Sequence, residues 1–207
     1  GTSSSMVVGL INCLITLKGL KRSDLQIIKD AYKIERKICK ISGGWQDQIV
    51  SQKGGYLRVK ISKKEKIKIS KILITKKIEK LIKNHLLLIY SKVKRQSKLI
   101  IDSQKKNTSK YRYYDEIKNL NKPIKKYFSS GKFKELGKFF EKHWLIKKNL
   151  SNKITNKTIE KLYSILNKDL KICGCKLIGA GGGGFFLVAV DKKKELTKKL
   201  KFLKINH

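Results

Sequence analysis

The N-terminal part of the chain shows the apolar spacing that is typical of helices. Residues 7–17 are almost all apolar and uncharged, which predicts a buried helix that begins among the hydroxyl-bearing residues 2–5. A second helix is indicated by the capping residue Ser23 with Gln26 three positions later, and it should end near Lys40. The apolar face expected on this second helix consists of Leu25, Ile28, Ala31, Tyr32 and Ile38.

The middle of the chain changes from helical spacing to alternation and back. Residues 56–61 and 67–74 alternate apolar and polar positions, which predicts a β-hairpin. Residues 76–83 predict a short helix, and the apolar run 86–90 predicts a buried strand. From residue 98 to 168 the spacing is helical, so a helical bundle is expected. The expected breaks in it are Pro123, residues 129–131 and residues 149–152.

The C-terminal part contains a run of glycines between two apolar segments. Residues 175–178 predict a strand, GAGGGG follows at 179–184, and the apolar run FFLVAV leads into a lysine-rich helix that reaches Leu203. Glycine-rich segments are often flexible linkers, but linkers lie among polar residues. Glycines between two strands instead allow the backbone to approach another segment closely, so we expect an ordered loop.

The charge of the chain suggests a polyanionic partner, but its residue types argue against a specific one. Among 207 residues, 40% are hydrophobic, which is enough for a core, and the net charge is +36. The cations are 46 Lys and only 5 Arg, whereas base and phosphate recognition favours the arginine fork. We therefore expect solvated surface lysines and no specific nucleic acid partner, with a lysine-rich nucleic-acid-binding protein as the alternative.

The cysteines and the N-terminal residues bear on the cellular compartment. The 4 Cys and 3 His show no zinc-ligand spacing and no disulfide framework, which favours a reducing compartment such as the cytoplasm. The uncharged N-terminal segment lacks the basic region of a signal peptide and is short for a membrane span, so no membrane association is expected.

Two segments are candidates for chemistry by themselves. GTSSS opens the first helix, where hydroxyls and free N–H groups favour an anion such as phosphate, although an ordinary helix cap is equally compatible with it. ISGGWQDQIV, residues 41–50, holds one carboxylate, Asp47, between two glutamines. A lone Asp is most often a turn residue or a cap, so neither segment defines a function alone.

The ordered combination GTSSS, ISGGWQDQIV and CKLIGAGGGGFFLVAV resembles the GHMP kinase superfamily, the small-molecule kinases named for galactokinase, homoserine kinase, mevalonate kinase and phosphomevalonate kinase. Within it, the chain is most similar to the D-glycero-D-manno-heptose 7-phosphate kinase and fucokinase group. Residues 143–163 also resemble the Trp-x-x-Lys-Lys helical section of this group. In two places the chain departs from the pattern: it begins at the last glycine of the phosphate loop, and Ser91-Lys92 replaces Thr-Gly.

The resemblance implies an α+β fold of two domains. Residues 1–75 would be the remainder of the N-terminal, ATP-binding domain, and residues 76–207 a ferredoxin-like C-terminal domain with a helical section. The sheet that normally precedes the phosphate loop would be missing, so the fragment alone is expected to be inactive.

The resemblance also implies roles for individual residues, with ATP and Mg²⁺ as cofactors. Asp47 would be the catalytic base. The residues implied for ATP phosphates are Gly1, Thr2, Ser3 and Ser4, and those implied for the metal are Ser3 and Glu35. The residues implied for the substrate and the active-site loop are Gln46, Gln48, Arg95, Gly179, Gly181, Gly182 and Gly183. The glutamines would bind sugar hydroxyls or fix the carboxylate. Lys147 and Lys148 are expected at the surface.

The implied function is ATP-dependent phosphorylation of a sugar at its anomeric hydroxyl, for nucleotide-sugar synthesis. D-glycero-D-manno-heptose 7-phosphate is the first candidate substrate. A fucokinase-like or galactokinase-like sugar 1-kinase is the alternative enzyme. In either case the partner is a small sugar or sugar phosphate.

Overall fold

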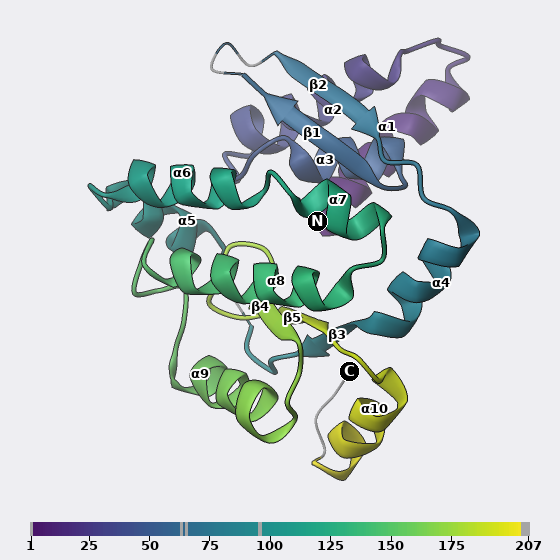
Figure 1. Ribbon diagram of the computed structural model, residues 1–207. Helices are drawn as coiled ribbons and strands as arrows, with labels where there is room; N and C mark the ends of the chain where they lie inside the picture. The colour runs from purple at the N-terminus through teal and green to yellow at the C-terminus, as the bar shows by residue number, and fades with distance from the viewer. Residues whose placement is uncertain (1, 63, 65, 95–96, 204–207) are drawn as a thin grey trace. The chain divides into compact units, whose positions relative to one another are not determined.

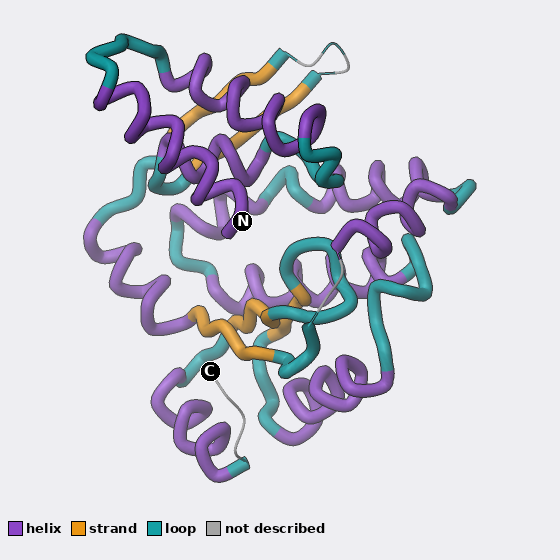
Figure 2. Tube along the Cα trace, turned by 180° about the vertical axis from the view of Figure 1, so that it is seen from behind, coloured by secondary structure: helices purple, strands orange, loops and turns teal. Residues whose placement is uncertain are grey.

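The computed structural model describes the whole chain except residues 1, 63, 65, 95–96 and 204–207 (Figure 1). The chain divides into two compact units, Gly1–Leu73 and Ile74–His207, and each is described by itself. Figure 2 shows the strands in orange, two of them in the first unit and three in the second. No helix among the described residues has the length and apolar character needed to cross a membrane.

The described residues of the first unit form three α-helices, a π-helix and a hairpin. Its elements are α1 (Thr2–Leu17), α2 (Asp24–Tyr32), η1 (Lys33–Ile38), α3 (Gln46–Lys53), β1 (Leu57–Ile61) and β2 (Ile67–Lys71). The helices α1, α2 and α3 contact one another. The strands β1 and β2 are antiparallel, with Leu57 opposite Lys71, which confirms the predicted hairpin.

The predicted start of α2 is confirmed in detail. The Ser23 side chain accepts a hydrogen bond from the backbone of Gln26, and the Gln26 side chain accepts one from the backbone of Ser23. This reciprocal capping box satisfies N–H groups that the first helical turn leaves free. The helix then widens into η1, where the N–H of Cys39 reaches back five residues to Ile34 at 2.9 Å.

Two predictions about apolar faces in this unit are wrong. The first helix is present, but only Ser4 and Val8 on it are buried, and Leu10 is 59% exposed. Helices α2 and α3 cover only part of the apolar surface of α1, so apolar side chains on its other side stay exposed within the unit. On the second helix, Ile28 and Ala31 are buried as predicted, whereas Leu25 is 44% exposed and Ile38 is 64% exposed. A π-turn holds more than 3.6 residues, so η1 rotates Ile38 away from the face it would share in an α-helix.

The second unit contains helices on a three-stranded antiparallel sheet. Its elements are α4 (Lys76–His85), β3 (Leu86–Tyr90), α5 (Ser97–Lys106), α6 (Lys110–Leu120), α7 (Ile124–Ser129), α8 (Phe133–Lys148), α9 (Lys157–Ser164), η2 (Ile165–Asp169), β4 (Gly174–Leu177), β5 (Phe185–Ala189) and α10 (Lys193–Phe202). The strand order is β3-β5-β4. The helical section with its breaks is confirmed. The strand predicted at 86–90 is present, but it is not buried as predicted: Ile89 is fully buried, whereas Leu88 is 46% exposed.

The α+β prediction is confirmed, and the order strand, helices, two strands, helix corresponds to the first five elements of a ferredoxin-like β-α-β-β-α-β unit. The main core lies between the sheet and its helices, around the fully buried Trp144 and Phe186, whose rings meet edge to face. Helix α8 crosses β4 at very short range. A Cβ on Gly137 would lie 2.6 Å from the backbone oxygen of Cys173, so only glycine permits this crossing.

Candidate active site

The start of α1 supplies two serines that lie in different environments. Ser3 is exposed at the first turn, whereas Ser4 is 1% exposed and turned into the unit. The first turn of α1 contains no acidic residue. Its N–H groups have no partner within the helix, so this end of α1 keeps the positive potential that favours phosphate. Thr2, Ser3 and Ser4 are therefore placed at an anion-compatible helix terminus.

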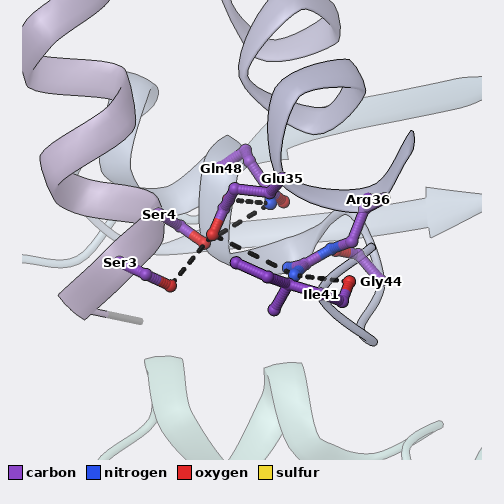
Figure 3. Close-up of polar contacts among 7 residues, drawn as sticks. All are labelled: Ser3, Ser4, Glu35, Arg36, Ile41, Gly44 and Gln48. Atoms are coloured by element: carbon purple, nitrogen blue, oxygen red, sulfur yellow. Dashed lines mark hydrogen bonds and ion pairs between the residues drawn. The ribbon is translucent and has the colours of Figure 1, made fainter. Parts of the chain in front are cut away.

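A buried carboxylate, Glu35, joins this terminus to α3 (Figure 3). Glu35 comes from η1 and is 1% exposed. The hydroxyl of Ser3 donates to its Oε1 at 2.9 Å, and the amide of Gln48 donates to its Oε2 at 2.5 Å. The same Gln48 nitrogen lies 3.3 Å from Ser4 Oγ. Three segments that are far apart in sequence therefore meet at one acid.

The Glu35 carboxyl is held in its charged form. Burial alone would raise its pKa, but hydrogen bonds from Ser4, Gln48 and Ser3, together with the nearby Arg36 guanidinium, lower the pKa below its usual value. An ionised carboxylate and a serine hydroxyl are the hard oxygen ligands that Mg²⁺ prefers, so Ser3 and Glu35 fit this metal. Within the described part of the chain there is no cluster of three or more His, Cys, Asp or Glu.

Arg36 holds the loop that connects η1 to α3. Its guanidinium donates to the carbonyl of Ile41 and to that of Gly44, both at 3.3 Å, and lies 4.0 Å from Glu35 Oε1. A Cβ on Gly43 would lie 2.7 Å from the guanidinium carbon. A side chain at position 43 would therefore push the guanidinium away from the carbonyls of Ile41 and Gly44. Arg36 was not among the predicted site residues, although it is one of only 5 arginines and directly follows Glu35, which was predicted as a metal ligand.

The three polar residues at the start of α3 point to different places. Asp47 is half-buried in the first turn, and no partner for its carboxylate is found within the described part of the chain. Gln46 is exposed, whereas Gln48 is fully buried with Glu35 and Ser4. The glutamines were expected to bind sugar hydroxyls or to fix the carboxylate of Asp47, but the carboxylate that Gln48 contacts is Glu35. Just before them, the Trp45 ring stacks on Tyr32 at 3.5 Å.

The glycine loop of the second unit is ordered by close contacts. Gly179, Gly181, Gly182 and Gly183 all have positive φ. A Cβ on Gly183 would lie 2.3 Å from a backbone oxygen, that of Val93. The N–H of Gly182 donates to the carbonyl of Ile154 at 2.7 Å. The loop is thus a fixed structure rather than a linker, as its sequence context predicts.

The expectation that Lys147 lies at the surface is wrong. It is 8% exposed, and its ammonium donates to the carbonyls of Gly179 and, at 3.3 Å, of Leu177. A buried cation requires such partners, so Lys147 anchors the start of the glycine loop. Lys148 is half-buried and pairs with Glu160 at 3.3 Å. The sequence gives no sign that Lys147 is buried and Lys148 only half-buried, because lysine is the commonest cation throughout the chain.

The remaining sequence-predicted residues fall elsewhere. Gly1 and Arg95 lie outside the described residues. The glycine loop belongs to the second unit, whereas the serines, Glu35 and Asp47 belong to the first. Within the first unit, the structure brings Ser3, Ser4, Glu35 and Gln48 together. The four cysteines are free, and Cys175 is buried.

A helix terminus suited to phosphate, an adjacent pair of oxygen ligands and an ordered glycine loop in an α+β fold are the features expected from the resemblance to small-molecule kinases. Two family profiles match the chain, the GHMP kinases N terminal domain over residues 1–55 and the GHMP kinases C terminal domain over residues 124–206. The chain belongs to the GHMP kinases.

Similar proteins within that family include sugar kinases and a mevalonate kinase. A D-glycero-alpha-D-manno-heptose 7-phosphate kinase of Campylobacter jejuni is 27% identical over 97% of this chain and 60% of the relative. A mevalonate kinase of Methanocaldococcus jannaschii is 29% identical over 97% of the chain and 61% of the relative. The crystal structure of a D-glycero-D-manno-heptose 1-phosphate kinase from Bacteroides thetaiotaomicron matches with a TM-score of 0.76 at 20% identity, over 98% of this chain and 57% of that one. The chain thus spans about three fifths of the length of the proteins it matches.

Proposed function

We propose that the protein to which these residues belong transfers a phosphoryl group from ATP to a sugar hydroxyl. The acceptor that we favour is the anomeric hydroxyl of D-glycero-D-manno-heptose 7-phosphate. The observation that carries this proposal is the contact of Ser3 with the buried, ionised Glu35 at the start of α1. Phosphoryl transfer asks a protein chiefly to hold phosphates and metal and to orient the acceptor, and this contact joins the first two tasks.

The α1 terminus would bind the ATP phosphates through the N–H groups and hydroxyls of Thr2, Ser3 and Ser4. Ser3 and Glu35 would hold Mg²⁺, which neutralises charge on the phosphates when bound. Gln48 keeps the Glu35 carboxylate oriented through a bond of 2.5 Å, and it adds no charge that would repel a triphosphate.

Asp47 would accept the proton of the attacking hydroxyl. Its carboxylate is half-buried in the first turn of α3 and engages no group among the described residues, so its lone pairs are available to a substrate. The exposed Gln46 beside it would hydrogen-bond a sugar hydroxyl. We further propose that the unit Gly1–Leu73 is the remainder of the ATP-binding domain and that the glycine loop lines the active site.

The alternative is a fucokinase-like or galactokinase-like sugar 1-kinase that takes an unphosphorylated sugar. The same residues would act on either kind of substrate, because the sugar's own phosphate takes no part in the transfer. The substrate therefore has to be found by a direct comparison of acceptors.

The test is a coupled assay of ADP release with heptose 7-phosphate, fucose, galactose and mevalonate as acceptors. Two polypeptides are compared, these 207 residues and the same residues with whatever is encoded in frame before Gly1. We expect turnover with a sugar acceptor from the longer polypeptide and little or none from the shorter. Asp47→Asn should lower kcat by at least about a hundredfold, as is typical for loss of a general base.

The matched control is Asp115→Asn, which removes an exposed carboxylate from α6 in the other unit and should leave kcat unchanged. An equal kcat for wild type and Asp47→Asn would refute the role of Asp47. Turnover with mevalonate alone would refute the sugar as the acceptor.

A further inference from the structure

A surface pocket of about 650 Å³ lies in the first unit, and its described lining residues do not include Ser3 or Glu35. Three segments line it: α2 with the following η1, the residue Trp45 before α3, and the β1–β2 hairpin near Lys66. This volume is within the usual range for small-molecule sites, roughly 300–1,000 Å³. None of the roles proposed above uses this pocket.

The charged side chains of the pocket are almost all cations. Five lysines line it, and they are Lys29, Lys33, Lys37, Lys64 and Lys66. The acid that lines it is Asp30, and no ion pair is found between these described lysines and a described acid. Like charges gathered on one concave surface repel one another and concentrate an anion there. The pocket therefore favours a ligand with several negative charges.

The pocket also offers a flat apolar wall. Tyr32 and Trp45 line it as a parallel stack, with ring centroids 3.5 Å apart and planes 3° apart, and Leu25 and Ile67 add aliphatic surface. Aromatic and aliphatic walls bind the ring or carbon skeleton of a ligand, while cations hold its charged end. An inorganic ion such as phosphate would contact the lysines but not the aromatic and aliphatic side chains.

A lysine-rich composition alone does not produce this arrangement. The smaller pocket beside α10 in the second unit is also lined by lysines, but Asp191 and Glu195 line it as well. There, Lys192 pairs with Glu195 at 3.1 Å. That pocket also lacks an aromatic pair among its lining residues. The pocket at Trp45 thus combines unbalanced charge with a ring surface.

We propose that the pocket lined by Lys33, Lys37, Lys66 and the Tyr32–Trp45 stack is a second ligand site, which binds a small phosphorylated molecule. The lysines hold the phosphate group, and the stacked rings and aliphatic side chains hold the remainder. A nucleotide and a sugar phosphate share this chemistry. The site stands on its own residues and does not depend on the kinase proposal.

The experiment observes the two tryptophan indole N–H signals of the ¹⁵N-labelled chain during titration with ATP, glucose 6-phosphate or tripolyphosphate, without Mg²⁺. The chain contains 2 Trp, and Trp144 is fully buried in the other unit, so it serves as the internal control. We expect the Trp45 signal, assigned with Trp45→Phe, to shift to saturation with ATP or the sugar phosphate. Whichever of the two binds more tightly identifies the source of the phosphate.

Lysine variants then separate the pocket from general charge. Lys33→Gln with Lys37→Gln should weaken binding about tenfold, which corresponds to about 1.4 kcal/mol. The matched control, Lys194→Gln with Lys198→Gln, removes the same charge from exposed positions of α10 that do not line the pocket, and it should change affinity less than about twofold. Ser3→Ala should leave the Trp45 shift intact, because Ser3 belongs to the other site.

Three results would overturn the proposal. One is an unmoved Trp45 signal at millimolar concentrations of both organic phosphates. Another is an equal loss of affinity in the two lysine double variants. The third is tighter binding of a single-stranded oligonucleotide that both double variants weaken alike, since this would indicate a diffuse nucleic-acid surface.

Discussion

The contact between Gln48 and Glu35 gives a direct test of the buried network in the first unit. Gln48 is fully buried, and its amide lies 2.5 Å from a carboxylate whose pKa is lowered. Gln48→Glu keeps the shape of the side chain and replaces a donor by a second acid. Two carboxylates at this distance cannot both ionise cheaply, so the folded variant will take up one proton.

The cost of that proton sets the size of the effect. The unfolded chain releases it with a glutamate pKa near 4.3, so keeping it bound at pH 7 costs about 3.7 kcal/mol at most. The protonated acid can still donate a hydrogen bond to Glu35, so no other large loss is expected. We expect Gln48→Glu to lower the free energy of unfolding by about 2–4 kcal/mol at pH 7.

The sign of the pH dependence distinguishes this mechanism from simple misfolding. The folded variant binds more protons than the unfolded chain, so its stability rises as the pH falls from 7 toward 4.3. In the wild type, the lowered pKa of Glu35 has the opposite effect, and its stabilising contribution, present above the usual value of 4.5, is lost as the pH falls through the folded pKa. The two stability curves should therefore converge in acid.

The assay is urea unfolding followed by the Trp45 indole N–H signal at several pH values. Gln46→Glu is the matched control, since it adds the same acid at an exposed position of the first turn of α3, where it should be neutral or slightly favourable. Glu35→Gln combined with Gln48→Glu restores a single carboxylate and should recover most of the loss. A Gln48→Glu deficit that is independent of pH, or an unrescued double variant, would refute the reasoning.

Three further predictions concern the second unit. In thermal unfolding, Gly137→Ala should destabilise this unit by about 2 kcal/mol, because the new Cβ would lie 2.6 Å from a backbone oxygen. The control is Gly9→Ala in α1 of the first unit, where no atom lies within 4 Å, and it should be neutral or stabilising by up to about 1 kcal/mol. Burial lowers the pKa of Lys176 from 10.5 to about 8, so wild-type stability should rise with pH between these values, and Lys176→Met should lack this rise in urea titrations. Lys147→Met removes the ammonium from the loop carbonyls, so hydrogen exchange at the Gly182 amide should accelerate, and unchanged protection there would contradict the anchoring role.

The sequence predicts the elements of this fold well because local signals agree with the final structure. The capping box at Ser23 and Gln26 fixes the start of α2, and alternation fixes the hairpin. What a linear pattern cannot show is a change of helical pitch. The apolar spacing assigned Ile38 to a buried face, but the π-turn that places the N–H of Cys39 on Ile34 rotates it to 64% exposure.

The sequence identifies the motif residues of the candidate site, but it does not identify the residues that contact them in space. Ser3 and Glu35 are singled out by resemblance, and the structure places them 2.9 Å apart. Arg36 and Lys147 are missed because each makes its bonds to backbone carbonyls, and a sequence gives no sign of which carbonyls lie near a given cation. Gln48 illustrates the same limit, since its partners Glu35 and Ser4 are 13 and 44 positions away.

The position of Glu35 links the fold to the chemistry. It follows Ile28 and Ala31 at intervals of seven and four, so the hydrophobic pattern of α2 itself directs it inward. An apolar side chain at this position would need no hydrogen-bond partners, whereas a buried carboxylate is tolerated only with several donors. Ser3, Ser4 and Gln48 supply those donors, and Arg36 adds a positive charge at 4.0 Å. Four groups from three segments thus stabilise one buried charge at the start of α1, beside the hydroxyl that we propose as a metal ligand.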